Sequence, residues 1–368
     1  MNLTIPFDPA IRILILAAVV FNVVLILTYV ERKVLGHIQQ RLGPMRTGFH
    51  GILQAPADAV KLMFKEDLTP NSADRLVYQL APFLVFVPIF MMFITIPLTA
   101  TLVVQNLDLG LFYLVALSSL HIVGLLMAGW GSDNKYALLG GVRSAAQLIS
   151  YELPLAFAVM GVVLLTGTLN LTTIVHNQAL VPLVVLQPLG FVIFLIASLA
   201  EMGRTPFDIP MAESEVVGGP WVEYSGMRWA IFFLGEYASL FASCALMVVL
   251  YLGGWMVPFA GGLDPITGTI IGAAWFLLKT MLLVFFVFWL RGTLPRLRID
   301  QLMAFAWKML IPFSFLNLIL TAWALVYGDE LPSLLPFIHP AGSWLIVAGS
   351  VATVLFAYAV HRQTRRSA

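Results

Sequence analysis

The chain has 368 residues, of which 60% are hydrophobic and only 11% are charged. A soluble protein carries about a quarter charged residues, so this composition excludes an ordinary soluble enzyme. The net charge of +1 offers no polybasic surface for nucleic acid. The single cysteine, Cys244, cannot build an iron–sulfur cluster, a cysteine-rich zinc site or an internal disulfide. We therefore expect an integral membrane protein that holds no metal centre of its own.

A helix needs about 20 apolar residues to cross a bilayer, and nine stretches of the chain meet this requirement. The predicted spans are 11–30, 77–103, 109–130, 147–168, 181–201, 229–252, 269–290, 304–327 and 342–361. The first lacks a small-residue cleavage site and is interpreted as a retained span, not a signal peptide. No linker or repeat interrupts the chain, so the prediction is an all-α polytopic transmembrane bundle forming one domain, 1–368.

Basic residues predict the orientation of these spans, because Lys and Arg concentrate in cytoplasmic loops. Of the 20 basic residues, only Arg12 and Lys279 fall outside one alternating set of loops and the C-terminal tail. The other set of loops, which contains no Lys or Arg, is 104–108, 169–180, 253–268 and 328–341. We therefore predict nine spans with the N-terminus outside and the C-terminus inside.

Residues 51–65 of the first inner loop have an apolar and a charged face. Ile52 and Leu62 fall on the first face at helical spacing, and Asp58 and Lys65 fall on the second. This pattern is typical of an amphipathic helix that lies in the membrane interface. Such a helix either only completes the loop or lines an entry site, and the sequence is compatible with both.

The third inner loop, 202–228, is the most acidic segment of the chain. Its carboxylates, together with the residue that ends the preceding span, are Glu201, Asp208, Glu213, Glu215 and Glu223. The apolar, turn-prone stretches 206–210 and 218–221 predict that this loop folds back into the protein. Carboxylates drawn inside would have raised pKa values and could carry protons, whereas carboxylates left in solvent would not.

Four ionisable residues lie within predicted spans: His121, Glu152, Glu236 and Lys279. A charge at mid-membrane costs about 2.5–3.5 kcal/mol on insertion scales, so such residues usually mark a pathway. The alternative is a buried structural pair, for instance Lys279 with Glu236. For His121, a neutral ring hydrogen-bonded to a neighbouring helix is at least as compatible as a proton relay.

Motifs in four successive inner loops resemble one known family. They occupy 31–36, 40–44 and 57–62; then 129–136, 138–140 and 147–152; then 200–208, 212–215 and 223–227; then 295–303 and 307–308. Glu31-Arg32-Lys33-Val34-Leu35-Gly36 and Glu223-Tyr224-Ser225-Gly226-Met227 are among them. These motifs are similar to those of the H subunit (subunit 1 in mitochondria) of respiratory complex I, the NADH:quinone oxidoreductase. The resemblance covers about residues 25–325 and leaves the span 342–361 as an extension.

The resemblance implies a multi-pass subunit of the bacterial inner membrane whose inner loops form much of a quinone chamber. It implies that the chain couples quinone reduction to proton translocation without redox chemistry of its own. Quinone would be the substrate, and FMN and iron–sulfur clusters would belong to partner subunits. The implied partners are the peripheral-arm quinone-site subunits, other membrane-arm subunits and membrane lipid, with no nucleic acid.

The resemblance also assigns roles to individual residues. The implied chamber residues are Arg32, Arg41 and Asp58 at the entrance, with Arg296 and Arg298 from the fourth loop. The implied proton path is Glu201, Asp208, Glu213, Glu215 and Glu223, continued into the membrane by Glu152, Glu236 and Lys279. An Arg side chain can stabilise the negative charge that develops on a quinone, and a titratable carboxylate can relay its protons.

The chain departs from the family pattern at a few positions. Met211 stands where an acidic residue is usual, and Pro220 and Val222 replace an aromatic and a hydroxyl residue. Met45 and Phe49 replace a usual Asn and Pro.

Two alternatives to the complex I subunit stay open: the membrane anchor of an energy-converting hydrogenase-type complex, and a stand-alone ion transporter.

Overall fold

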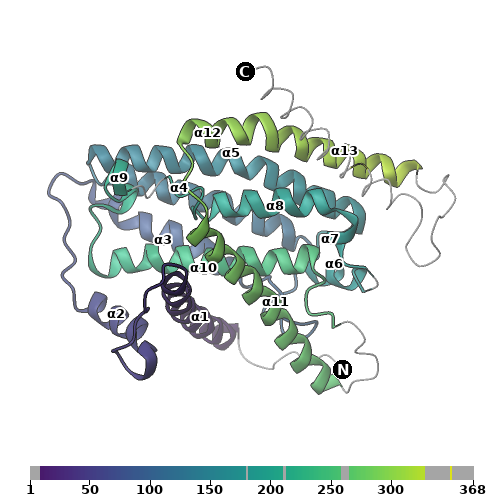
Figure 1. Cartoon of the computed structure of the whole chain (residues 1–368), viewed down its shortest axis with the longest axis horizontal. Coiled ribbons are helices and arrows are strands. Elements are labelled where there is room, and N and C mark those ends of the chain that lie inside the picture. The colour runs from purple at the N-terminus through teal and green to yellow at the C-terminus, as the bar shows by residue number, and fades with distance from the viewer. Residues whose placement is uncertain (1–8, 180, 210–212, 258–264, 328–348, 350–368) are drawn as a thin grey trace.

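The computed structural model of this chain describes residues 9–179, 181–209, 213–257, 265–327 and 349 (Figure 1). The elements in chain order are α1 (Pro9–Ile38), η1 (Phe49–Gly51), α2 (Gln54–Met63), α3 (Arg75–Met92), α4 (Gly110–Gly131), α5 (Lys135–Thr166), α6 (Leu171–Asn177), α7 (Leu183–Leu186), α8 (Pro188–Glu201), α9 (Glu213–Val216), η2 (Gly219–Trp221), α10 (Gly226–Tyr251), α11 (Pro265–Thr293), α12 (Ile299–Phe305), the π-helical η3 (Ala306–Leu310) and α13 (Ile311–Tyr327). Every regular element in the described part of the chain is helical, which confirms the predicted all-α class.

Seven helices in the described ranges are long and apolar enough to cross a membrane: α1, α3, α4, α5, α10, α11 and the continuous run α12–η3–α13. The predicted fifth span, 181–201, is broken at Gln187, whose φ of −127° and ψ of 63° are not helical. Pro188 then begins α8, because proline fits the first turn of a helix, and α8 is only 14 residues long. The predicted ninth span, 342–361, lies outside the described residues apart from position 349. The number of spans and their orientation stay predictions.

Several predicted boundaries are wrong, two of them by more than ten residues, because windows of hydropathy detect apolar residues but not helix ends. Helix α3 ends at Met92, not near residue 103, and the chain then runs in turns where the Thr99 hydroxyl accepts the Leu102 amide at 3.0 Å. Helix α5 begins at Lys135, twelve residues before the predicted 147, because the Asn134 side chain caps it by accepting the Tyr136 amide at 2.9 Å. Lys135 and the residues after it, predicted as loop, therefore form the first turns of a helix.

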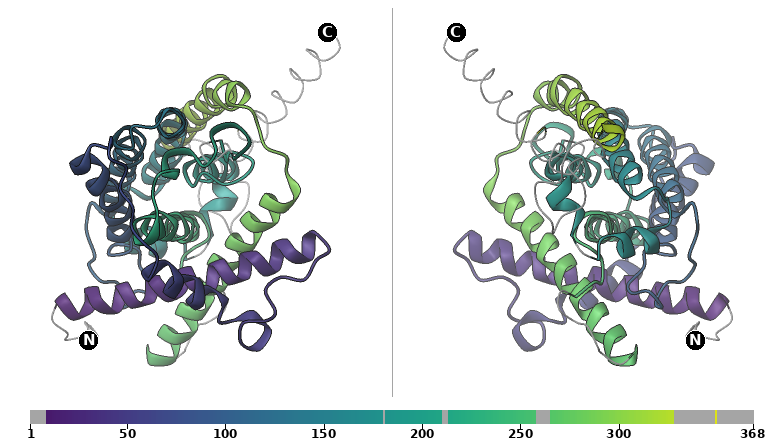
Figure 2. Two further views of the ribbon diagram at one scale, coloured as in Figure 1. Left: turned by 90° about the vertical axis from the view of Figure 1, so that its left-hand side faces the viewer. Right: turned by 90° about the vertical axis from the view of Figure 1, so that its right-hand side faces the viewer.

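Helix α10 occupies the middle of the bundle. Of its most apolar 18-residue window, 72% is buried, against 22% for α1. Helices α3, α4, α5 and α8 run nearly along the same axis, whereas α1 and α11 cross them obliquely (Figure 2). Helices α3 and α4 approach closely at Gly124, where a Cβ would lie 2.8 Å from the backbone of Leu84. This arrangement surrounds α10 with protein and leaves α1 and α11 with large exposed apolar faces.

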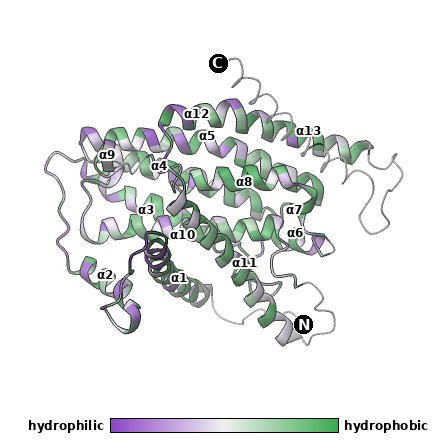
Figure 3. Ribbon diagram, in the orientation of Figure 1, coloured by the Kyte–Doolittle hydropathy of each residue, from purple (hydrophilic) through white to green (hydrophobic). Residues whose placement is uncertain are grey.

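The polar residues gather at one end of the bundle, around α2, α9 and the starts of α5 and α12 (Figure 3). The predicted amphipathic segment 51–65 forms α2, which packs against α1 and α10. The alternating basic loops therefore meet at one end of the fold.

A set of contacts joins the first of these loops to the start of α10. Tyr78 and Tyr224 stack with ring centroids 4.1 Å apart, and Arg228 pairs with Asp67 at 2.9 Å. The Ser225 hydroxyl donates to the Glu66 carbonyl at 3.1 Å. We call these contacts, between 66–78 and 224–228, the loop clasp; it holds the first loop beside α10.

Candidate functional site

A buried cluster of four charged side chains joins three helices and a loop at the polar end of the bundle. Glu31 from α1 and Arg204 from the loop after α8 are almost fully buried, and Nη1 of Arg204 lies 3.4 Å from both carboxylate oxygens of Glu31. Arg291 of α11 also donates to Glu31. Nη2 of Arg204 lies 3.1 Å from Oε1 of Glu236 on α10, within ion-pair distance but without hydrogen-bond alignment. Two carboxylates and two guanidinium groups thus compensate one another.

Arg204 is the centre of this cluster. Its guanidinium lies 4.5 Å from the ring centroid of Tyr237, at cation–π distance. Burial opposes the charge of Arg204, but the carboxylates of Glu236 and Glu31 outweigh burial and raise its pKa above the usual value. The arginine therefore stays charged, and it fixes the loop after α8 against α1 and α10.

Asp208 extends the cluster along the same loop. Burial, with a contribution from Glu236, raises the pKa of Asp208 to about 6, although Arg291, Arg296 and Arg204 oppose the shift. The loop meets the segment before α12, because the Leu297 amide donates to the Pro206 carbonyl at 3.1 Å. The predicted chamber residue Arg296 is therefore a neighbour of the predicted proton carrier Asp208.

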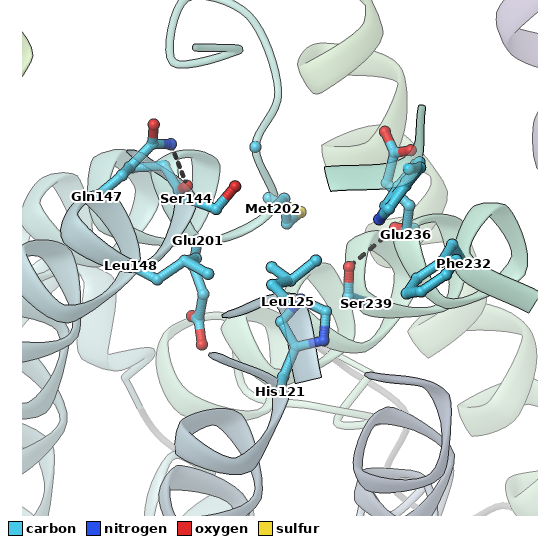
Figure 4. A pocket seen from close by; sticks show the side chains of 13 residues that line it. His121, Leu125, Ser144, Gln147, Leu148, Glu201, Met202, Phe232, Glu236 and Ser239 are labelled. Atoms are coloured by element: carbon cyan, nitrogen blue, oxygen red, sulfur yellow. Dashed lines mark hydrogen bonds between the residues drawn. The ribbon is translucent and has the colours of Figure 1, made fainter. Parts of the chain in front are cut away.

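A cavity of about 50 Å³ lies beside this cluster, between α4, α5, α8 and α10 (Figure 4). Glu201 and Glu236 lie on different sides of it, and His121 enters from α4. Gln147 Oε1 and Trp221 Nε1 belong to lining residues and have no hydrogen-bond partner among the described residues. A water molecule needs about 10–15 Å³ of such space and several polar partners, so the cavity has room for a few waters between the two carboxylates.

His121 makes the helix contact that was one of its two alternatives, while its role as a proton relay stays a prediction. Its Nδ1 lies 3.3 Å from the Val85 carbonyl of α3, and because a carbonyl only accepts, Nδ1 carries the hydrogen. The same ring lines the cavity. The histidine is thus bound to a neighbouring helix and also borders the space between Glu201 and Glu236.

Glu201 also lines a second cavity, of about 20 Å³, deeper in the bundle. Ser118, Ser198 and Ser243 supply polar groups to this second cavity. Glu201 interacts with the Ser118 hydroxyl and with the charge of Glu152. Glu152 in turn accepts a hydrogen bond from Ser119. The predicted residues Glu201 and Glu152 are therefore neighbours, and Glu201 connects the two cavities.

The predicted entrance residues are partly brought together. Nη1 of Arg32 donates to Oδ2 of Asp58 at 2.6 Å, and Gln54 donates to Oδ1 of the same carboxylate at 3.0 Å. Both partners of this ion pair are more than a third exposed. Arg41 is exposed and donates to the Gln39 side chain at 2.7 Å, and Arg298 is exposed at the start of α12.

The remaining acidic residues of the third loop lie towards α5. Arg143 pairs with Glu215 at 2.6 Å, and the Asn134 side chain donates to Glu223 at 2.5 Å. Glu213 begins α9, but its side chain lies outside the described set, as does Met211.

Lys279 does not join the other predicted residues. Its Nζ donates to the Leu252 carbonyl at 2.7 Å, at the C-terminal end of α10. Glu236 lies 16 residues earlier on that helix, which corresponds to about 24 Å at 1.5 Å per residue. The suggested Lys279–Glu236 pair is therefore not formed; Glu236 pairs with Arg204.

Sequence reasoning gave no role to Arg204 or Arg291, which it counted only as basic loop residues, and it quoted Glu31 only within a motif. The available signal was the position of Glu31 directly after an apolar span, since a carboxylate there needs a buried partner. Which arginine supplies that partner is a long-range contact, spanning 173 residues for Arg204 and 260 for Arg291. In the described part of the chain, no group of three or more His, Cys, Asp or Glu converges as metal ligands.

The family model of NADH dehydrogenase matches residues 11–322. This chain belongs to the H-subunit family of NADH-quinone oxidoreductase. It is 49% identical over 315 residues to the H subunit of Brevibacillus brevis, covering 86% of this chain and 92% of the relative. It is 52% identical over 309 residues to the H subunit of Geobacillus kaustophilus, covering 84% and 91%. It is 46% identical over 319 residues to the H subunit of Dehalococcoides mccartyi strain CBDB1, covering 87% of each.

These relatives bear out the resemblance carried by the four loop motifs. They favour the respiratory enzyme over the hydrogenase-type anchor and over the stand-alone transporter. The chain is a membrane subunit of an NADH-quinone oxidoreductase complex, and other subunits of that complex are implied as partners. The family match ends before the segment 342–361.

Proposed function

We propose that this chain forms part of a quinone chamber at the polar end of the bundle and relays protons from it through Glu201. The observation that carries the proposal is the 50 Å³ cavity bounded by both Glu201 and Glu236. A carboxylate that borders two cavities can take a proton on one side and release it on the other. Beside the cavity, Glu236 pairs with Arg204, and Asp208 lies near Arg296. A reduced quinone would face these basic residues.

The chamber part of the proposal depends on the loop residues. Quinone reduction consumes two protons and develops negative charge, which cationic groups at the right position stabilise. Arg296 lies near Asp208, so a quinone headgroup there would have a cation and a proton donor within one cluster. Arg32 and Asp58 join α1 to α2 on the exposed side and would border the entrance. Lys279 lies apart from this set and is not included in the proton path.

The electrons would come from FMN and iron–sulfur clusters in partner subunits, and this chain would contribute no redox group. Its place would be the bacterial cell membrane, at the junction with the peripheral arm, with the basic end of the bundle on the inner side. Membrane lipid would cover the exposed faces of α1 and α11.

Replacing Glu201 with Gln in the assembled complex tests the relay. NADH-driven quinone reduction and the accompanying proton translocation would be measured in proteoliposomes. We expect at least a roughly tenfold loss in one of the two rates, because a positioned acid–base group contributes about 100-fold or more. Glu66→Gln is the matched control, since its side chain is exposed and borders neither cavity. Unchanged reduction and translocation in Glu201→Gln would contradict the relay.

Replacing Arg41 with Ala tests the entrance. The apparent KM for quinone is expected to rise about tenfold or less, the loss of one exposed charge-assisted contact, with little change in kcat. Arg46→Ala in the same exposed loop is the control. An unchanged KM in a normally assembled complex would remove Arg41 from the chamber.

A further inference from the structure

Two consecutive serines of α4 accompany the carboxylates of Glu201 and Glu152. Ser118 lines the smaller cavity together with Glu201, and its hydroxyl interacts with that carboxylate. Figure 4 shows that the Glu201 carboxylate points away from Glu236. Ser119, the next residue of α4, donates to Oε1 of Glu152 on α5. The charges of Glu201 and Glu152 also interact with each other, so two neighbouring carboxylates each have a serine hydroxyl beside them.

Both hydroxyls reach the same backbone oxygen. The Ser118 hydroxyl donates to the Val115 carbonyl at 2.8 Å, and the Ser119 hydroxyl lies 3.3 Å from the same oxygen. A carbonyl oxygen has two lone pairs, and one of them accepts the Ser119 amide within the regular α-helix. One acceptor position of Val115 therefore remains for two hydroxyls.

Each serine can serve its carboxyl group in both protonation states. A hydroxyl has one hydrogen to donate and two lone pairs that accept. When the carboxyl group is ionised, the hydroxyl can donate to it. When the carboxyl group is protonated, the hydroxyl can accept from it and donate to Val115 instead. The carboxyl group thus keeps a hydrogen bond in either state, which lowers the free-energy cost of gaining or losing its proton.

The single remaining position on Val115 links the two serines. In the structure Ser118 makes the shorter bond to Val115, while Ser119 donates to Glu152. This arrangement fits a proton on Glu201 and a negative charge on Glu152. In the opposite arrangement Ser119 would donate to Val115, and Ser118 would donate to Glu201. That second arrangement fits a proton on Glu152 and a negative charge on Glu201.

We propose that Ser118 and Ser119 are positioning residues that hold two consecutive carriers of one proton. The proton leaves the carboxyl group of Glu201 and binds the carboxylate of Glu152, while each serine exchanges its partner and keeps one hydrogen. This inference rests on the proposed relay through Glu201 and adds the step that follows it. Because Glu152 is half-buried and Ser119 is exposed, this step brings the proton to the outer face of α4 and α5.

Alanine and threonine variants of the two serines test the hydroxyl groups. In proteoliposomes with the assembled complex, Ser118→Ala and Ser119→Ala should each lower NADH-driven proton translocation about tenfold or more, the contribution of a hydrogen bond to a charged group. Ser118→Thr and Ser119→Thr keep the hydroxyl and should restore most of the rate. The restoration by threonine separates a role of the hydroxyl from a role of the small side chain in packing.

Ser314→Ala is the matched control, and it should translocate protons at the unmodified rate. The Ser314 hydroxyl on α13 donates to the Ile311 carbonyl at 2.8 Å, three residues earlier, as the Ser118 hydroxyl does to Val115, but it borders neither cavity. A loss in the alanine variants that threonine does not restore would overturn the inference. Unchanged alanine variants beside an impaired Glu201→Gln would overturn this inference alone, whereas an unchanged Glu201→Gln would overturn the relay as well.

A density map of the unmodified complex provides a test that needs no variant. We expect Ser118 Oγ within about 3.2 Å of a carboxyl oxygen of Glu201, and Ser119 Oγ within about 3.2 Å of a carboxyl oxygen of Glu152. If either serine lies beyond hydrogen-bond distance of its carboxyl group, the pair does not position the two carriers.

Discussion

Replacing Arg204 with methionine should destabilise the protein strongly, because the buried cluster would lose one of its two positive charges. Removing one partner of a buried ion pair costs about 3–5 kcal/mol, since the remaining charge is left uncompensated. We expect the lower end, about 3 kcal/mol, because Arg291 still pairs with Glu31 and Glu236 keeps some solvent contact. At 1.36 kcal/mol per factor of ten, the equilibrium towards the unfolded chain shifts by about two powers of ten.

The assay is the thermal denaturation midpoint of the purified complex. A change of about 3 kcal/mol corresponds to a decrease of roughly 4 °C for a chain of 368 residues, because the unfolding entropy is about 2.1 cal/mol/K per residue. Arg143→Met is the control, because its ion pair with Glu215 lies at the surface, with Arg143 half-buried and Glu215 exposed, and such pairs contribute about 1 kcal/mol or less. Combining Arg204→Met with Glu236→Gln restores charge balance and should recover part of the loss. If Arg204→Met melts like Arg143→Met, the cluster does not stabilise the fold.

Two further predictions concern Asp208 and Gly140. Because burial raises the pKa of Asp208 to about 6, the folded protein holds this proton more tightly than the unfolded chain, and the associated stability is lost as pH rises from about 4 to 6. The melting temperature of Asp208→Asn should therefore exceed that of the unmodified complex at pH 7, and the two melting temperatures should converge near pH 4. The same difference in melting temperature at pH 7 and at pH 4 would contradict this. Gly140→Ala should cost about 1–3 kcal/mol, because the new Cβ would lie 2.5 Å from the Gly219 Cα, whereas Gly110→Ala, with its nearest atom at 3.7 Å, should melt normally.

The sequence predicted the helices well because each apolar run is long and the bilayer permits few alternatives to a helix. It failed at ends that depend on a single polar contact, such as the Asn134 cap of α5. It also failed at Gln187, where one residue interrupts an otherwise apolar run. Hydropathy averages over such positions.

The candidate site was predictable in its residue types but not in its pairing. The acidic third loop does fold inward at Asp208, as its apolar spacers predicted, while Glu215 remains exposed. The partners of Glu31 and Glu236 could not be inferred, because the choice among several arginines depends on how α1, α10 and α11 pack. The partner of Lys279 could not be inferred either. Its position within a span suggested a proton pathway, whereas its Nζ donates to the Leu252 carbonyl at the end of α10.

The loop clasp has a consequence for biosynthesis. Its partners are far apart in the chain: 159 residues separate Ser225 from Glu66. At about 5–20 residues per second, a ribosome needs roughly 8–30 s to synthesise that interval, and meanwhile the first loop has its contacts with α1, such as Arg32–Asp58, but not the loop clasp. The α10 part of the surface against which α2 packs is therefore absent until α10 has been made. A nascent chain that stops before residue 224 would lack the whole loop clasp, and its first loop would be more accessible to quality-control proteases.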